Sequence, residues 1–151
     1  RCKSALTGIE LYNAKGENVK IYFDTKERKL VMDRTESGLI EFGKLSVPHD
    51  LEKNYADVHQ GAGNTPFRVF NSVNYKNDFA LGTWAPLSLC KGKTYHVDIF
   101  VDKCSVEIFV DGGRIAMTNL VFPTTPYTSI KFYNKGTSAS FHNIKISELS
   151  L

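Results

Sequence analysis

The chain has 151 residues, of which 42% are hydrophobic and 23% charged, and its 19 basic and 16 acidic side chains give a formal net charge of +3. This length suits a single domain with a core of its own. The even charge balance excludes an acidic tail and argues against a nucleic-acid-binding stripe. Charged residues interrupt every apolar run well short of the roughly 20 residues that a membrane helix needs, so we expect no transmembrane segment.

The first residue is Arg1, and no basic-then-apolar leader follows it, so we expect no signal peptide and interpret the chain as a processed product or a fragment. Three cysteines, Cys2, Cys90 and Cys104, cannot all pair within the chain, and no CxxC spacing indicates zinc or redox chemistry. Metal-ligand spacing is also absent among the four histidines, which are His49, His59, His96 and His142. We therefore predict no metal and no cofactor.

Alternating apolar and polar side chains, the pattern of half-buried strands, recur along the chain, whereas helical spacing is nearly absent. The alternation is seen in residues 19–23, 30–32 and 130–132, and residues 141–146 predict a last strand. Residues of β-branched and aromatic type dominate these runs, and Gly, Asn, Asp and Pro separate them. The pattern is typical of an all-β antiparallel sandwich or barrel.

The stretch from Thr94 to Phe122 predicts a three-stranded meander. If Asp102–Lys103 is a two-residue loop, Ile99 faces Val106 and Val97 faces Ile108, and one continuous apolar face results. Asp111-Gly112-Gly113 then predicts a second hairpin turn, because glycine accepts positive φ angles. Ile115 and Met117 join the apolar face whether that turn is centred on 111–112 or on 112–113.

The same register places Asp98 directly opposite Glu107 on the other face of the meander. Two opposed carboxylates repel one another unless a cation or a proton intervenes. Either the face is simply solvated, or Arg34, Lys103 or the hydroxyls of a ligand relieve the repulsion.

Two separated motifs are distinctive. One is the segment 102–110, DKCSVEIFV, followed by Met117-Thr118 and by Val121-Phe122-Pro123. The other is the segment 30–38, LVMDRTESG. Together they resemble the C-terminal β-sandwich module of glycoside hydrolase family 32, the family of invertases, levanases and inulinases. Lys103 and Cys104 replace the usual Arg and Ser, which removes a planar, bidentate donor at that turn.

The resemblance implies a lectin-like, jelly-roll type sandwich of two antiparallel sheets with roughly ten to twelve strands. It also implies that residues 1–151 form one domain, the C-terminal module of a larger enzyme. Residues 44–75 look longer than is usual for the module and are interpreted as an elaborated loop. Family 32 enzymes hydrolyse fructosides with two carboxylates in an N-terminal five-bladed propeller, and none of the propeller motifs occurs here. We therefore predict no catalytic residue in this chain.

Three functions remain open. The first is a noncatalytic module that packs against the propeller of its parent enzyme and stabilises it. The second is a carbohydrate-binding module that recognises the fructose units of fructans. The third is an independent enzyme, which the absence of metal-ligand spacing, of a nucleophile elbow and of a phosphate loop argues against. We expect no nucleic-acid or membrane partner, and since polymeric fructans are usually attacked outside the cytoplasm, we favour an extracellular or periplasmic location.

A fructose site would need carboxylates and arginine to bind hydroxyls and an aromatic side chain to stack on the sugar. The candidates are Asp33, Arg34, Trp84, Asp98, Glu107 and Tyr133. A structural interpretation stands beside the functional one: Asp33, Arg34 and Glu107 would form a buried ion-pair network between two strands, and Trp84 would be a core or interface anchor.

Overall fold

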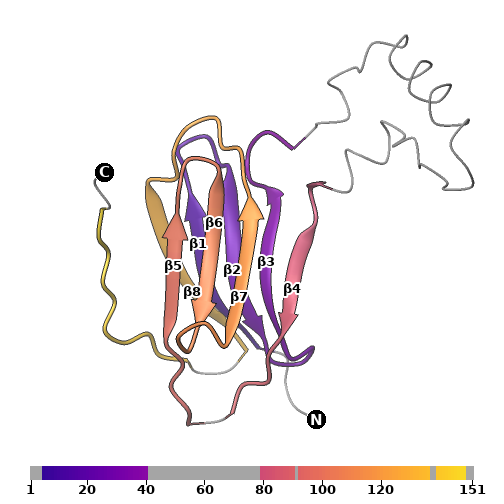
Figure 1. Cartoon of the computed structure of the whole chain (residues 1–151), viewed down its shortest axis with the longest axis vertical. Coiled ribbons are helices and arrows are strands. Elements are labelled where there is room, and N and C mark those ends of the chain that lie inside the picture. The colour runs from indigo at the N-terminus through magenta and orange to yellow at the C-terminus, as the bar shows by residue number, and fades with distance from the viewer. Residues whose placement is uncertain (1–4, 41–78, 91, 137–138, 149–151) are drawn as a thin grey trace, which may run out of the picture.

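The computed structural model describes residues 5–40, 79–90, 92–136 and 139–148, and these residues form two antiparallel β-sheets packed face to face (Figure 1). Their strands are β1 (Leu6–Tyr12), β2 (Asn18–Asp24), β3 (Lys29–Glu36), β4 (Gly82–Pro86), β5 (Val97–Val101), β6 (Ser105–Val110), β7 (Ile115–Leu120) and β8 (Ser129–Lys135). The first sheet has the order β4-β3-β2-β1-β8 and the second the order β5-β6-β7. The predicted all-β sandwich is confirmed, while the predicted loop at 44–75 lies outside the described residues.

No helix among the described residues is long and apolar enough to cross a membrane.

The core lies between the two sheets and is built by alternation along the strands. Leu30 and Met32 of β3 and Val106 and Ile108 of β6 are completely buried, whereas their strand neighbours face outward. The other buried members of this cluster are Leu11, Val19, Ile21, Leu87, Val110 and Val121. The alternation predicted for residues 19–23 and 30–32 is therefore confirmed.

The predicted meander is present as β5, β6 and β7, but its first register is wrong by two residues. Ile99 pairs with Ile108 rather than with Val106. The reason is the turn: the amide of Asp102 donates to the carbonyl oxygen of Ser105 at 2.9 Å, so residues 103–104 form the loop. A shift of two residues keeps each side chain on its predicted face, because side chains alternate with a period of two.

The second turn of the meander is centred on Gly112 and Gly113. Val110 pairs with Ile115 across it, and both glycines have positive φ angles, of 68° and 93°. Ile115 and Met117 pack against the core, as predicted.

The predicted last strand is wrong, because the described residues 139–148 form no strand. Phe141 contacts Phe132 of β8 with 4.9 Å between ring centroids, but Ile144 and Ile146 are 56% and 73% exposed. The spacing explains the error: residue 141 and residues 144 and 146 have opposite parity, so one strand cannot present all three side chains to the same face.

The two motifs that carry the family resemblance lie side by side at one edge of the sandwich. The amide of Leu39 donates to the carbonyl oxygen of Phe122 at 2.8 Å, and the hydroxyl of Tyr127 donates to the carbonyl oxygen of Ser37 at 2.5 Å. Gly38 sits between these contacts with a φ of 128°, and a Cβ added there would lie 2.4 Å from the Phe122 carbonyl oxygen. These residues join the end of β3 to the segment after β7.

A second polar connection joins the β1–β2 turn to the segment after β7. The Asn13 amide, on a buried side chain, donates to Glu17 Oε2 at 2.6 Å and to the carbonyl oxygen of Thr125 at 2.8 Å. Glu17 Oε2 also accepts from the amide of Thr124 at 2.9 Å, and Glu17 Oε1 accepts from the Thr124 hydroxyl at 2.6 Å. The Glu17 carboxylate is thus the acceptor that holds two distant segments together.

Candidate functional site

The six predicted carbohydrate-contact residues lie in three separate parts of the sandwich. The strand pairings place Asp33, Trp84 and Tyr133 on the outer face of the five-stranded sheet. Arg34 has the parity of Leu30 and Met32 and lies between the sheets. Asp98 and Glu107 lie on the outer face of the three-stranded sheet.

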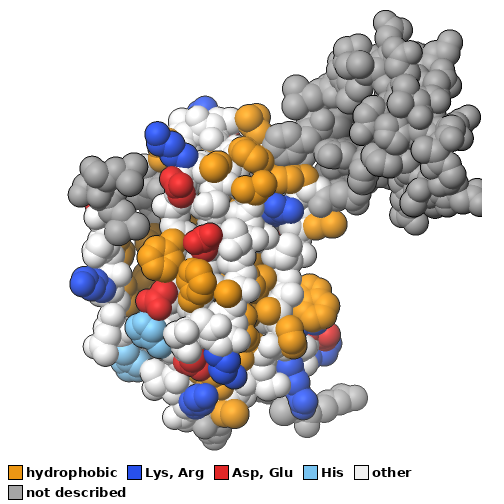
Figure 2. Space-filling model, in the orientation of Figure 1, with side chains coloured by type: hydrophobic (Ala, Val, Ile, Leu, Met, Phe, Trp, Pro, Cys, Tyr) orange, Lys and Arg blue, Asp and Glu red, His pale blue; other side chains and the backbone are white. Residues whose placement is uncertain are grey.

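The predicted opposition of Asp98 and Glu107 is wrong. In the observed register Asp98 pairs with Phe109 and Glu107 pairs with Phe100, so the two carboxylates are diagonal neighbours. Figure 2 shows this side of the molecule, where hydrophobic and acidic side chains alternate over β5 and β6. Asp98 Oδ1 lies 3.0 Å from Nε2 of His96, so the polar partner of this carboxylate is the imidazole ring and not Glu107.

Arg34 has a structural role. Its guanidinium donates to the carbonyl oxygen of Leu120 on β7 at 2.9 Å and lies 4.1 Å from the ring centroid of Phe79. Burial lowers the pKa of this guanidinium. The predicted ion-pair network is replaced by this contact with the backbone of the opposite sheet, while Asp33 Oδ1 accepts from the amide and the hydroxyl of Thr35 at 3.0 and 2.7 Å.

An aromatic row crosses the outer face of the five-stranded sheet. Trp84 pairs with Val31, Val31 with Tyr22, Tyr22 with Gly8, and Gly8 with Tyr133, so one residue from every strand contributes to the row. Side chains that are directly paired point to the same face of a sheet.

 Along the chain, Trp84 lies 62 residues after Tyr22 and 49 residues before Tyr133, yet the sheet places all three on one surface.

Tyr22 is the member of this row that sequence reasoning missed. The outward position of Tyr22 follows from the alternation of residues 19–23, so the signal was present. Gly8 has no side chain, and a Cβ there would lie 2.7 Å from Cβ of Tyr22. Burial raises the pKa of Tyr133, and Tyr22, Glu10 and Asp33 raise it further, so its phenol stays neutral and can both donate and accept.

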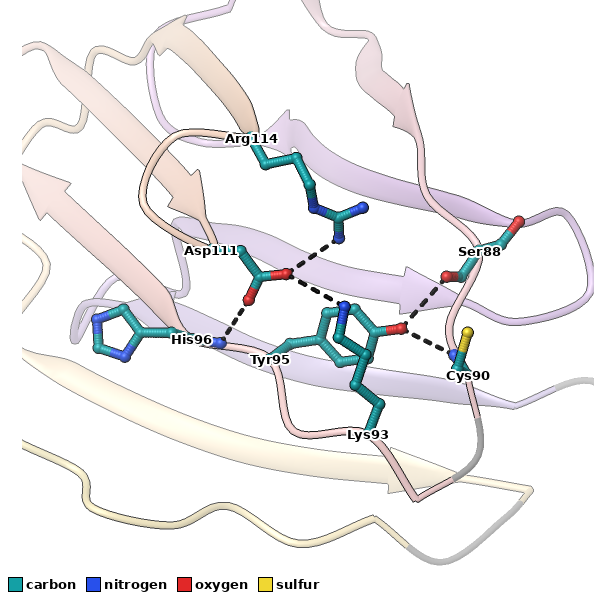
Figure 3. Close-up of polar contacts among 7 residues, drawn as sticks. All are labelled: Ser88, Cys90, Lys93, Tyr95, His96, Asp111 and Arg114. Atoms are coloured by element: carbon teal, nitrogen blue, oxygen red, sulfur yellow. Dashed lines mark hydrogen bonds and ion pairs between the residues drawn. The ribbon is translucent and has the colours of Figure 1, made fainter.

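A cluster of charged and polar side chains surrounds the β6–β7 turn (Figure 3). Side chains of these types can form a reactive centre, but here their contacts fix the turn. Asp111 accepts from the backbone amide of His96 at 3.1 Å, from Arg114 at 3.1 Å and lies 3.8 Å from Lys93 Nζ. The hydrogen bond from the His96 amide is the main reason why the pKa of Asp111 is lowered. A carboxylate held ionised by two cations and an amide serves to fix the turn rather than to transfer protons.

The other side of this cluster fixes the segment that leads into β5. The hydroxyl of Tyr95 accepts from the amide of Cys90 at 2.8 Å and donates to the carbonyl oxygen of Ser88 at 3.4 Å (Figure 3). Cys90 and Cys104 are both free and exposed. The described residues contain no group of three His, Cys, Asp or Glu side chains placed to hold a metal ion.

We expect the Glu17 carboxylate to make the fold sensitive to acid. Burial raises the pKa of Glu17, but hydrogen bonds from Thr124, Asn13 and the backbone lower it by more, so the folded-state pKa lies below the usual range. The stability that this group contributes is therefore complete above the ordinary pKa of about 4.3 and is lost as the pH falls through the folded-state value. Urea unfolding between pH 7 and pH 3 should show a smaller loss of stability for Glu17→Gln than for the wild-type chain.

Glu10→Gln is the matched control for this prediction, because Glu10 lies on the outer face of β1, where it pairs with Lys20 and Lys131 rather than with the segments that Glu17 joins. Its unfolding free energy should fall with acid as the wild-type value does. Parallel pH profiles for the wild-type chain and Glu17→Gln would contradict the role given to Glu17.

The fold and its polar contacts define a β-sandwich module whose charged groups mainly hold loops and sheets together. Comparison with known protein families assigns the chain to the same class of module. The sequence profile of the family described as "Glycosyl hydrolases family 32 C terminal" matches residues 3–148. The chain belongs to this family, and it is a noncatalytic C-terminal module of the family 32 type.

Two relatives are similar to this chain in sequence, and one solved structure is similar to it in fold. The chain is 36% identical over 95 residues to a levanbiose-producing levanase of Bacillus subtilis (strain 168). The aligned residues make up 63% of this chain and 17% of that protein. It is 21% identical over 142 residues to a levanase of Bacillus sp. strain L7, covering 94% of this chain and 12% of that protein. An exo-inulinase from Aspergillus awamori has a similar fold, with a TM-score of 0.50 and 20% identity over 85% of this chain and 21% of that chain.

Proposed function

We propose that this chain is the accessory module of an enzyme that hydrolyses fructans, and that it stabilises an N-terminal five-bladed propeller that carries the reaction. The observation that supports this most directly is one of length. The chain matches less than a fifth of each levanase that it resembles, so most of each relative consists of residues outside the matched region.

The chemistry of the described residues is consistent with a supporting role. Three charged side chains, Arg34, Glu17 and Asp111, hold backbone amides and carbonyl oxygens in place. Retaining glycosidases need two carboxyl groups about 5–5.5 Å apart, with one kept protonated. The pKa of Asp111 and that of Glu17 are lowered rather than raised, which suits structural anions and not a general acid.

We also propose that the parent enzyme acts outside the cytoplasm, in the extracellular space or the periplasm. Both levanases in the comparison are named for a polymeric substrate, and a polysaccharide has to be degraded before it can be taken up through a membrane.

The experiment compares the parent enzyme with a version that lacks residues 1–151. Differential scanning calorimetry should give a lower unfolding temperature for the shortened enzyme, because the face that the module covers becomes exposed to water. Addition of the purified module should raise that temperature again in a concentration-dependent way. An unchanged unfolding temperature, together with no effect of the added module, would contradict the supporting role.

A further inference from the structure

We propose that the outer face of the five-stranded sheet binds a neutral furanosyl polysaccharide along the aromatic row formed by Trp84, Tyr22 and Tyr133. The identity of the ligand rests on the proposed function, because the substrate of a fructan-hydrolysing parent enzyme is the polysaccharide that this module would meet. The site itself rests on the strand pairings and on the side chains of this face.

The row has the length of a short oligosaccharide. It spans the five strands from Trp84 on β4 to Tyr133 on β8. Neighbouring strands are about 4.8 Å apart, so the row extends over roughly 19 Å. Trp84 is 57% exposed at one end, where β4 forms the edge of the sheet. Aromatic rings spaced along a line give successive sugar rings apolar surfaces on which to stack.

Polar side chains border the aromatic row on both sides. In the next row of pairs toward one end of the strands, Lys131 pairs with Glu10, Glu10 with Lys20, and Lys20 with Asp33. The charges along this row alternate in sign. On the opposite side Asp24 pairs with Lys29. Such mixed rows offer both donors and acceptors to hydroxyl groups, whereas a polyanion would require a surplus of positive charge.

A gap in the side chains lies between Trp84 and Asp33. Gly82 pairs with Asp33 and stands two residues before Trp84 on the same strand, so all three belong to the outer face. A Cβ added to Gly82 would have its nearest neighbour at 3.7 Å, in ordinary contact with Val31. The glycine is therefore not needed for packing, and its missing side chain leaves Asp33 approachable beside the indole ring.

Lys29 orients the indole ring. Its Nζ lies 4.2 Å from the ring centroid of Trp84, which is close enough for a cation–π interaction. The ammonium covers one face of the ring, and the opposite face is the one on which a sugar would stack.

The other outer face is a weaker candidate for the same ligand. Phe100 and Phe109 on the three-stranded sheet pack edge to face with each other, with 5.8 Å between their ring centroids. Phenyl rings lack the polar atom that indole and phenol rings present to hydroxyl groups. This face is therefore used as the control surface in the experiment.

Isothermal titration calorimetry of the purified chain with levan, inulin and dextran tests the proposal. The wild-type chain should bind levan or inulin and should bind dextran more weakly. Trp84→Ala should lower the affinity for the fructan by about tenfold or more, because a stacking surface is lost. Gly82→Val should lower it as well by filling the gap beside Asp33, and its unfolding temperature should stay close to that of the wild-type chain.

Phe100→Ala is the matched control and should bind as the wild-type chain does. The proposal is overturned if neither fructan binds, if dextran binds as tightly, if Trp84→Ala and Gly82→Val keep full affinity, or if Phe100→Ala is the variant that loses it. The supporting role is tested separately, by the unfolding temperature of the parent enzyme. If Trp84→Ala lowers that temperature and leaves fructan affinity unchanged, the aromatic row is a contact with the propeller, and the carbohydrate proposal fails while the supporting role stands.

Discussion

Gly38→Ala is expected to lower the free energy of unfolding by about 3–5 kcal/mol. Two effects add. The φ angle of 128° is one that side-chain-bearing residues rarely adopt, and the new Cβ would lie 2.4 Å from the carbonyl oxygen of Phe122 and 2.6 Å from Cα of Pro123. Both neighbours are backbone atoms, so relief requires the segment 121–123 to move. That movement would also weaken the hydrogen bond from Leu39 to Phe122.

Gly112→Ala separates the two effects. Gly112 also has a positive φ angle, of 68°, but a Cβ there would have no atom within 4 Å. Its cost should therefore be close to the conformational term alone, about 1 kcal/mol. Urea unfolding of both variants measures the difference, and similar losses for Gly38→Ala and Gly112→Ala would contradict the close approach of the two motif segments.

Ile108→Ala is expected to lower the free energy of unfolding by about 3–4 kcal/mol. Ile108 is completely buried on β6, the central strand of the three-stranded sheet, and it faces the core cluster of the five-stranded sheet. Its removal deletes apolar contacts and leaves a cavity between the sheets that the hydrogen-bonded strands cannot readily close. Chemical denaturation monitored by fluorescence gives the change directly.

Ile146→Ala deletes the same atoms from a residue that is 73% exposed. Its effect should stay within about 0.5 kcal/mol, because little apolar surface is returned to water. A comparable loss for the two variants would mean that the buried interface between the sheets is not where the stability of the fold resides.

The faces of the strands could be predicted from the sequence, whereas their exact partners could not. Alternation assigns Ile99 and Ile108 to the same face for a two-residue loop at either 102–103 or 103–104, because moving the centre of the turn by one residue shifts the partners by two. The centre of the turn depends on the hydrogen bond between Asp102 and Ser105, for which the sequence has no strong signal. The predicted opposition of Asp98 and Glu107 is wrong for this reason.

The contacts between sheets were beyond sequence reasoning for a different reason. Arg34 was predicted to join an ion-pair network, but its guanidinium binds the carbonyl oxygen of Leu120, 86 residues away. A backbone carbonyl is present at every position, so its choice as a partner leaves no trace in the residue types. The aromatic row is the intermediate case: each outward position can be predicted, but the alignment of Trp84 with Tyr22 and Tyr133 needs the strand order.

Release of fructose from levan, inulin and sucrose by the purified chain is the most direct test of its place in a family 32 enzyme. A noncatalytic module should release none above the rate of a buffer blank, while the parent enzyme assayed beside it should release fructose from at least one of the three. Sustained turnover by the purified chain, abolished by substitution of one of its own carboxylates, would contradict the account.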